Sequence, residues 1–176
     1  MAVPATSSTP FALIPLHLSS ALSILRVESP RRLLAGSFRT LSLVPVLVTG
    51  CAGFIGYHVA DALLRRGESV LGVDSMNHYY DPALKEARVG RLADHGGFSL
   101  ERIDLSDRTV IDGLRDRGID RIVHLAAQAG VRHSIERPFD YLDANLAAHL
   151  TVLELARAIE SPHLVFASSS SVYGGN

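Results

Sequence analysis

The sequence predicts an α/β protein built on a doubly wound parallel sheet. Two observations favour this fold class: short, continuously apolar runs alternate with amphipathic stretches from Pro45 onward, and the first run ends in a glycine-rich turn. Continuous apolar runs suit strands that are buried on both faces, and a repeated strand–helix order gives right-handed βαβ units. We expect the strand order 3-2-1-4-5, with ligands bound beyond the carboxyl ends of the strands where the order reverses.

The first βαβ unit has the clearest pattern. Residues 46–49 form a short, largely β-branched run that suits a strand. The helix expected over 56–66 carries apolar residues on one face and ends at Gly67. Residues 69–74 then have the apolar character of a second strand.

The remaining elements repeat this alternation. Pro82 favours the start of a charged helix over 81–93, and Gly118 ends a short helix over 107–117. A long helix is expected over 138–159, where leucines recur at spacings of four, four and three and make an apolar stripe: Leu142, Leu146, Leu150 and Leu153. The other strands are expected at 98–103, 121–125 and 164–167. Five strands are therefore present, and the last is expected to form an exposed apolar edge.

Composition limits the classes of function. The 176 residues carry 17 basic and 18 acidic side chains, so no excess of positive charge exists to hold nucleic acid or an anionic membrane. The single cysteine, Cys51, excludes a disulfide framework and a multi-cysteine metal site, and we expect no metal. We expect residues 1–44, whose apolar part is too short to span a bilayer, to be a disordered or spurious leader. Residues 45–176 are expected to form the domain of a cytoplasmic protein.

The turn after the first strand has the chemistry of a phosphate-binding site. Its glycines are Gly50, Gly53 and Gly56; the sharp turn, the approach to a pyrophosphate and close helix packing each favour glycine. Free N–H groups at the helix N-terminus attract phosphate. Asp74 ends the second strand, where a carboxylate accepts hydrogen bonds from ribose hydroxyls and repels a 2′-phosphate. An ordinary glycine-rich turn is the alternative, but this context predicts a Rossmann fold that binds NAD in preference to NADP.

Several motifs resemble the extended short-chain dehydrogenases/reductases, the NAD-dependent epimerase/dehydratase family. The spacing Thr-Gly-x-x-Gly-x-x-Gly falls at 49–56, and further matching stretches lie at 74–77, 104–105, 124–128, 145 and 167–174. Within this family, residues 77–81, 84–88 and 127–134 look like UDP-glucuronate 4-epimerases. The resemblance covers about 46–176 and nothing before it.

The resemblance implies roles for individual residues. NAD is expected to contact Gly50, Gly53, Phe54, Ile55, Gly56, Asp74, Asn77, Asp104, Leu105, Leu125, Ala126, Ala127, Gln128 and Asn145. Among these, Asn145 is expected to fix the backbone of the fourth strand. Ser169 is the expected catalytic hydroxyl, hydrogen-bonded to the sugar 4-oxygen, with Ser168 and Ser170 beside it. Arg132 suits the carboxylate or phosphate of a sugar nucleotide, with a solvated loop arginine as the alternative. His124 is expected to be a satisfied strand histidine.

The activity that the resemblance implies is conversion of UDP-glucuronate to UDP-galacturonate through a 4-keto intermediate, with NAD as cofactor. The UDP-sugar is then the substrate, and the helix at 138–159 is a candidate homodimer interface. The family pairs its catalytic tyrosine with a lysine four residues later, but none of the five tyrosines here has such a partner, since Lys85 is the only lysine.

The C-terminal strands and the sugar-binding lobe of the family are also missing, so we expect an inactive N-terminal fragment. The alternatives are another nucleotide-sugar epimerase, a 4,6-dehydratase, or a non-catalytic NAD-binding module.

Overall fold

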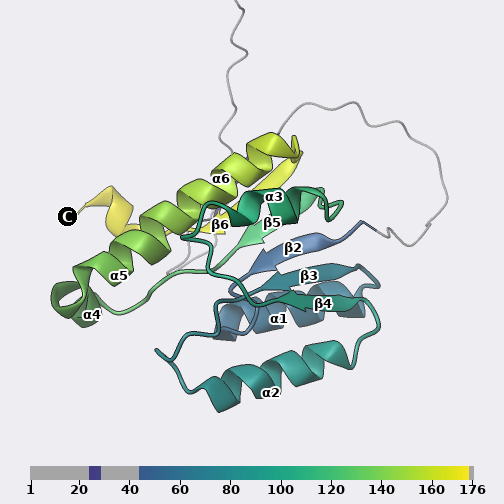
Figure 1. The fold of residues 1–176 in the computed structure, drawn as a ribbon, viewed down its shortest axis with the longest axis horizontal. Coiled ribbons are helices and arrows are strands. Elements are labelled where there is room, and N and C mark those ends of the chain that lie inside the picture. Colours follow the sequence, from purple (N-terminus) through teal and green to yellow (C-terminus); the bar gives the residue numbers. More distant parts are fainter. Residues whose placement is uncertain (1–23, 29–43, 175–176) are drawn as a thin grey trace, which may run out of the picture.

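The structure, a computed structural model, describes residues 24–28 and 44–174 and centres on one six-stranded sheet (Figure 1). The strands are β1 (Ile24–Glu28), β2 (Val46–Thr49), β3 (Val70–Val73), β4 (Phe98–Glu101), β5 (Arg121–His124) and β6 (His163–Ala167). Their order is β1-β6-β5-β2-β3-β4, and every pairing among β2 to β6 is parallel. The doubly wound fold and the 3-2-1-4-5 order are therefore confirmed.

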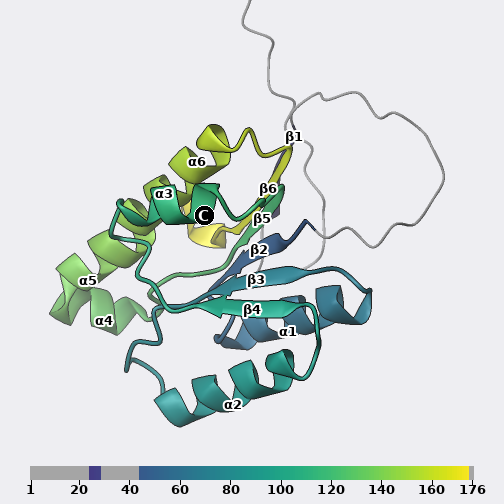
Figure 2. The same cartoon turned by 45° about the vertical axis from the view of Figure 1, so that its right-hand side comes forward.

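Helices cover both faces of this sheet. They are α1 (Phe54–Arg65), α2 (Pro82–Ala93), α3 (Val110–Arg115), α4 (Val131–Glu136), α5 (Pro138–Leu142) and α6 (Ala148–Ala158). The pair α1 and α2 lies on one face and the pair α3 and α6 on the other (Figure 2). A π-helical turn at Asp143–Ala147 joins α5 to α6, and a 3₁₀ turn at Ser170–Tyr173 follows β6. The long helix expected over 138–159 is thus interrupted, and α4 lies in a stretch for which no helix was predicted.

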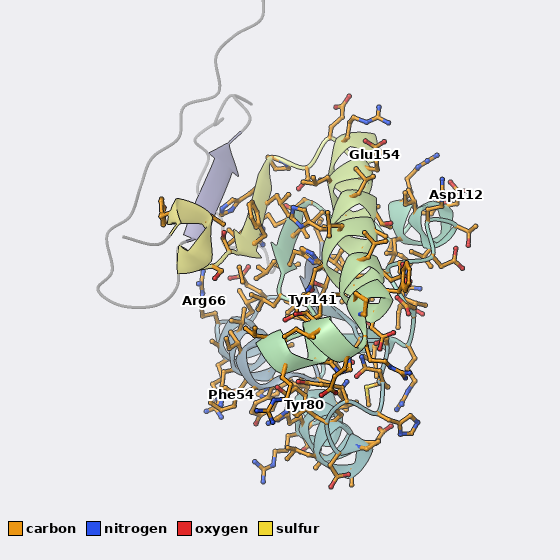
Figure 3. The ribbon with its side chains drawn as sticks, turned by 90° about the vertical axis from the view of Figure 1, so that its left-hand side faces the viewer. Phe54, Arg66, Tyr80, Asp112, Tyr141 and Glu154 are labelled. Carbon is orange, nitrogen blue, oxygen red and sulfur yellow. The ribbon has the colours of Figure 1, made fainter. Side chains whose placement is uncertain are left out.

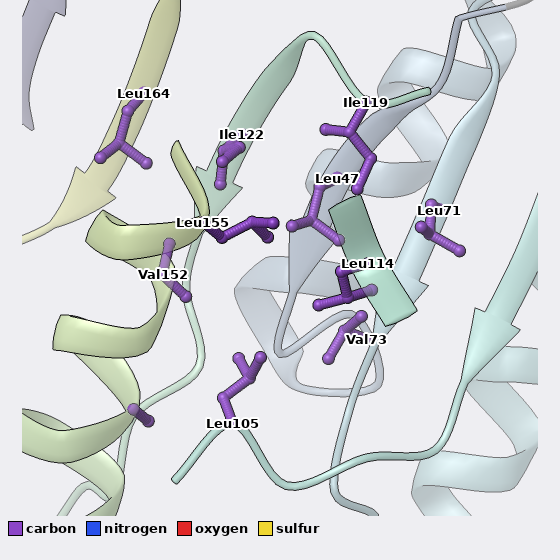
Figure 4. Packing of buried hydrophobic residues seen from close by; sticks show 11 residues of the cluster. Leu47, Leu71, Val73, Leu105, Leu114, Ile119, Ile122, Val152, Leu155 and Leu164 are labelled. Atoms are coloured by element: carbon purple, nitrogen blue, oxygen red, sulfur yellow. The ribbon is translucent and has the colours of Figure 1, made fainter. Parts of the chain in front are cut away.

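Strand β2 contributes side chains to two separate hydrophobic cores. Its four residues are all buried, as predicted for a central parallel strand. Leu47 packs on the side of α6 with Val152 and Leu155 (Figure 4), whereas Val46 and Val48 belong to the core under α1 and α2. Because side chains alternate along a strand, this one segment anchors both helical layers.

The edge of the sheet at β6 differs from the expectation. Strand β1 pairs antiparallel with β6, from Ile24 opposite Ala167 to Glu28 opposite His163. The prediction of an exposed edge at residues 164–167 is therefore wrong, because the backbone groups of that strand have a partner. Residues 24–28 of the expected leader form β1, whereas the rest, 1–23 and 29–43, lies outside the described residues.

The leucine stripe of the long helix faces solvent. Leu142, Leu146, Leu150 and Leu153 are all exposed. The residues of α6 that are buried are Ala148, Thr151, Val152 and Leu155. An apolar stripe that is not used by the sheet is available for another surface. None of the helices in the described ranges is long and apolar enough to cross a membrane.

Candidate functional site

A groove lies at the carboxyl ends of the parallel strands, where the strand order reverses between β2 and β5. Its walls are the turn after β2 and the loops after β3, β4 and β5. Ten of the residues predicted to contact NAD line its two adjoining hollows: Gly50, Gly53, Asp74, Asn77, Asp104, Leu105, Leu125, Ala126, Ala127 and Gln128. Segments distant in the sequence are therefore brought together at the position expected for a ligand in such a sheet.

The glycine turn is shaped by contacts that side chains would prevent. Gly50 has φ of +68°, and its carbonyl accepts a hydrogen bond from the Gly53 N–H at 2.9 Å. A Cβ atom on Gly56 would lie only 2.0 Å from the Gly50 oxygen. Helix α1 begins at Phe54 without a side-chain cap and without an acidic residue in its first turn, so no side chain caps the N–H groups at its N-terminus.

Two predicted cofactor residues project outward beside this turn. Phe54 and Ile55 lie in the first turn of α1, and their side chains are 68% and 44% exposed. Figure 3 shows Phe54 and Tyr80 at the same end of the molecule, with Asp112 far from both. Tyr80 also lines the groove.

Asp74, at the end of β3, is held by three donors. Its Oδ2 accepts a hydrogen bond from the Ala52 N–H at 3.1 Å, and its Oδ1 accepts one from the Met76 N–H at 2.9 Å. The third donor is Lys85 Nζ, 3.3 Å from Oδ1. This network fixes the carboxylate next to the glycine turn, because Ala52 belongs to that turn.

Lys85 is a residue of the site that the sequence analysis did not assign. It projects from α2 into the groove wall, is only 6% exposed, and also donates to Asn77 Oδ1 at 3.0 Å. Asp74 and Asn77, both predicted to contact NAD, are therefore joined by one buried ammonium group. The sequence did contain a signal that could have singled out this residue, because Lys85 is the only lysine among 17 basic residues.

The loop after β5 forms the opposite wall, and Asn145 holds it. Asn145 Oδ1 accepts a hydrogen bond from the Gln128 N–H at 2.8 Å, and its Nδ2 donates to the Gln128 carbonyl at 3.0 Å. Asn145 therefore contacts Gln128, which lies four residues after the end of β5. The expected contact was with the backbone of the strand itself. Asn145 lies in the π-helical turn, and such turns are frequent at functional sites.

Two buried titratable groups near the groove are uncharged at neutral pH. Burial, reinforced by the negative charge of Asp74, raises the pKa of the Cys51 thiol to about 12, which agrees with a space-filling role. Burial, reinforced by neighbouring His149, lowers the pKa of His124 to about 4. His124 is hydrogen-bonded within the fold, as expected for a strand histidine.

Three of the residues predicted to contact the sugar, Arg132, Ser168 and Ser169, lie apart from the two hollows. Ser168 and Ser169 follow β6, and Ser170 begins the 3₁₀ turn. Arg132 is exposed on α4. Arg132, Ser168 and Ser169 line neither hollow, and the roles of all four residues toward a sugar nucleotide stay predictions.

Comparison with known proteins gives consistent names. UDP-glucuronate 4-epimerase 3 of Arabidopsis thaliana is 46% identical over 153 residues, which cover 86% of this chain and 34% of that protein. A crystal structure of UDP-glucuronic acid 4-epimerase from Bacillus cereus, in complex with UDP-glucuronic acid and NAD, superposes with a TM-score of 0.67. It is 34% identical and covers 76% of this chain and 42% of that one.

A second structural relative is the UDP-glucose-4-epimerase of Stenotrophomonas maltophila with bound NAD. Its TM-score is 0.64 at 33% identity, covering 76% of this chain and 39% of that one. The chain thus spans well under half the length of these relatives. The model of the family described as "NAD dependent epimerase/dehydratase family" matches residues 46–176, and the chain therefore belongs to this family.

Proposed function

We propose that this chain forms the NAD-binding part of a nucleotide-sugar 4-epimerase that acts on UDP-glucuronate. The observation that carries the proposal is the single groove that joins the glycine turn, Asp74 and the loop at 125–128. The names of the similar proteins support the UDP-glucuronate assignment. NAD, when bound, supplies hydride acceptance and return at C4 of the sugar.

The residues of the groove fit a dinucleotide. The uncapped start of α1 offers N–H groups to a diphosphate, and the cradle between Gly50 and Gly56 leaves no room for a Cβ atom. Asp74 and Asn77 would hold the adenosine ribose, and Asp104 and Leu105 would flank adenine. The loop at 125–128 would face the nicotinamide ribose.

On the sugar side, we assign the hydrogen bond to the 4-oxygen to Ser169, flanked by Ser168 and Ser170. The segment follows β6 at the carboxyl end of the sheet, on the side of the groove away from Asp74 in the strand order. Arg132, at the start of α4, would meet a carboxylate or phosphate of the substrate.

Titration of the full chain with NAD, by calorimetry, tests the cofactor half of this proposal. We expect saturable binding that is weakened at least about tenfold in Asp74→Asn, because a neutral amide is a weaker acceptor for ribose hydroxyls. Asp112→Asn is the matched control, since this carboxylate on α3 is 83% exposed and remote from the groove. Absence of NAD binding by the folded wild-type chain would refute the proposal.

A turnover assay with UDP-glucuronate separates an enzyme from a binding module. We expect a protein of these 176 residues to bind NAD without turnover, because Lys85 is its only lysine and does not lie four residues after a tyrosine. A non-catalytic NAD-binding role is the second candidate. Turnover by the isolated chain would remove the second candidate and require another base in place of the tyrosine–lysine pair.

We further propose a homodimer that buries the leucine stripe of α5 and α6. Leu146 and Leu150 are 64% and 59% exposed on adjacent turns, which is unusual for large apolar residues unless a partner covers them. Sedimentation of Leu146→Glu and Leu150→Glu against wild type tests this, with Glu154→Gln as the surface control. A wild-type chain that sediments as a monomer at all concentrations would refute the dimer.

A further inference from the structure

We propose that His124 is a positioning residue: its imidazole orients the hydroxyl group of Thr49, which in turn holds the loop after β5 against the groove. Thr49 Oγ1 lies 2.7 Å from His124 Nδ1. The same oxygen accepts hydrogen bonds from the N–H groups of Leu125 at 3.0 Å and Ala126 at 3.1 Å. One hydroxyl therefore joins the ends of two neighbouring strands, β2 and β5.

The number of protons fixes the direction of every bond in this cluster. A hydroxyl group has one proton to donate and two lone pairs to accept with. The Leu125 and Ala126 N–H groups can only donate, so they use both lone pairs of Thr49. The hydroxyl proton then goes to His124 Nδ1, which must accept, and the proton of the neutral imidazole is placed on Nε2.

The surroundings of the ring maintain this arrangement. His124 is 5% exposed and stacks on His149 of α6, with ring centroids 5.1 Å apart and planes at 29°. His149 in turn packs edge-on against Phe166 of β6 at 5.0 Å. A protonated imidazole would carry a proton on Nδ1 and could no longer accept from Thr49, so the cluster requires a neutral ring.

The held loop is a wall of the groove. A Cβ atom on Gly50 would lie 2.8 Å from the Ala126 nitrogen, so the loop and the glycine turn are in close contact. The far end of the loop is fixed through Gln128 by Asn145. With both ends fixed, the wall is formed before any ligand arrives, and a preformed site binds with a smaller entropy loss.

The first test uses the free full chain and requires no ligand. Nitrogen NMR of His124 should show an unprotonated Nδ1 and a protonated Nε2, and hydrogen exchange should show protected amides at Leu125 and Ala126. Exchange at both amides should be at least about tenfold faster in His124→Phe and in Thr49→Val, since one or more hydrogen bonds are lost. It should stay near the wild-type rate in Thr49→Ser and in the matched control His149→Phe, which keep the Thr49–His124 contact.

The second test measures NAD affinity and rests on the proposed function. We expect the dissociation constant for NAD to rise about tenfold in His124→Phe, which corresponds to the loss of one hydrogen bond between neutral groups. Thr49→Ser should bind NAD like wild type. A wild-type His124 with its proton on Nδ1, or unchanged exchange at Leu125 and Ala126 in His124→Phe, would overturn the positioning role. The expected tautomer and exchange rates without any NAD binding would support the positioning role while refuting the cofactor assignment.

Discussion

Separation of the buried pair Asp74 and Lys85 should destabilise the fold strongly, and removal of both charges should restore much of the loss. The two perturbations are Asp74→Asn and Lys85→Met, alone and combined. Both side chains are 7% exposed, and Nζ lies 3.3 Å from Oδ1. Burial at this level removes most of the water that would otherwise solvate either charge.

The two single variants should differ in cost. Asp74→Asn leaves the buried ammonium group of Lys85 with neutral amide oxygens in place of a carboxylate, which predicts a loss of about 3 kcal/mol in the free energy of unfolding. Lys85→Met leaves the carboxylate with the N–H groups of Ala52 and Met76, so we expect a smaller loss of about 1.5 kcal/mol. The double variant should recover about 2 kcal/mol relative to the sum of the two.

Urea unfolding followed by circular dichroism measures all four proteins in one double-mutant cycle. Glu154→Gln is the matched control, because its partner Arg157 and its own carboxylate are both exposed, and we expect an unchanged midpoint. A coupling below about 0.5 kcal/mol would show that the two residues act independently, and the buried pair would then not be an element of stability.

Three further outcomes follow from the same structure. Gly56→Ala places a Cβ atom 2.0 Å from the Gly50 oxygen and should cost about 3 kcal/mol; an unchanged melting temperature would contradict the packing of the turn. The lowered pKa of His124, about 4 against 6.5, means that the unfolded chain binds the proton more readily. The neutral His124 ring therefore contributes about 3 kcal/mol to the free energy of unfolding above pH 6.5, and this contribution is lost as pH falls toward 4. In urea titrations, the free energy of unfolding of His124→Phe should no longer show this pH dependence. Asn145→Ala removes both hydrogen bonds to the Gln128 backbone, so amide exchange at Gln128 should accelerate and stability should fall by about 2 kcal/mol.

The parallel core was predictable from the sequence because its physics is local. Strand β2 is buried on both faces and therefore consists of consecutive apolar residues. The glycine turn was equally predictable, because its constraints are local: Gly50 has a φ of +68°, and a Cβ atom on Gly56 would collide with the Gly50 oxygen six residues earlier. Ten of the fourteen predicted cofactor residues line the groove because the topology places the carboxyl ends of the parallel strands at one edge.

The features that escaped prediction depend on contacts between distant segments. Strand β1 is defined by backbone pairing with β6. Such pairing uses N–H and C=O groups that all residues other than proline carry, so the residue types do not reveal it. The π-helical turn places Asn145 on the Gln128 backbone, whereas the leucine spacing suggested an uninterrupted helix. Lys85 lies in a charged amphipathic stretch, and only the packing of α2 against α1 and β4 shows that this one charge is buried beside Asp74.

The hydrogen-bonding capacity of Asp74 constrains how the proposed ribose contact can form. A carboxylate offers about four acceptor positions, and three are taken by Ala52, Met76 and Lys85. One position on Oδ2 is open, so a single ribose hydroxyl can be accepted without disturbance, whereas a second on Oδ1 must displace or share the ammonium group. The ion pair also carries no net charge, so the repulsion of a 2′-phosphate is weaker than an isolated carboxylate would give. Cofactor preference at this groove is therefore a property of the Asp74–Lys85 pair, and not of Asp74 alone.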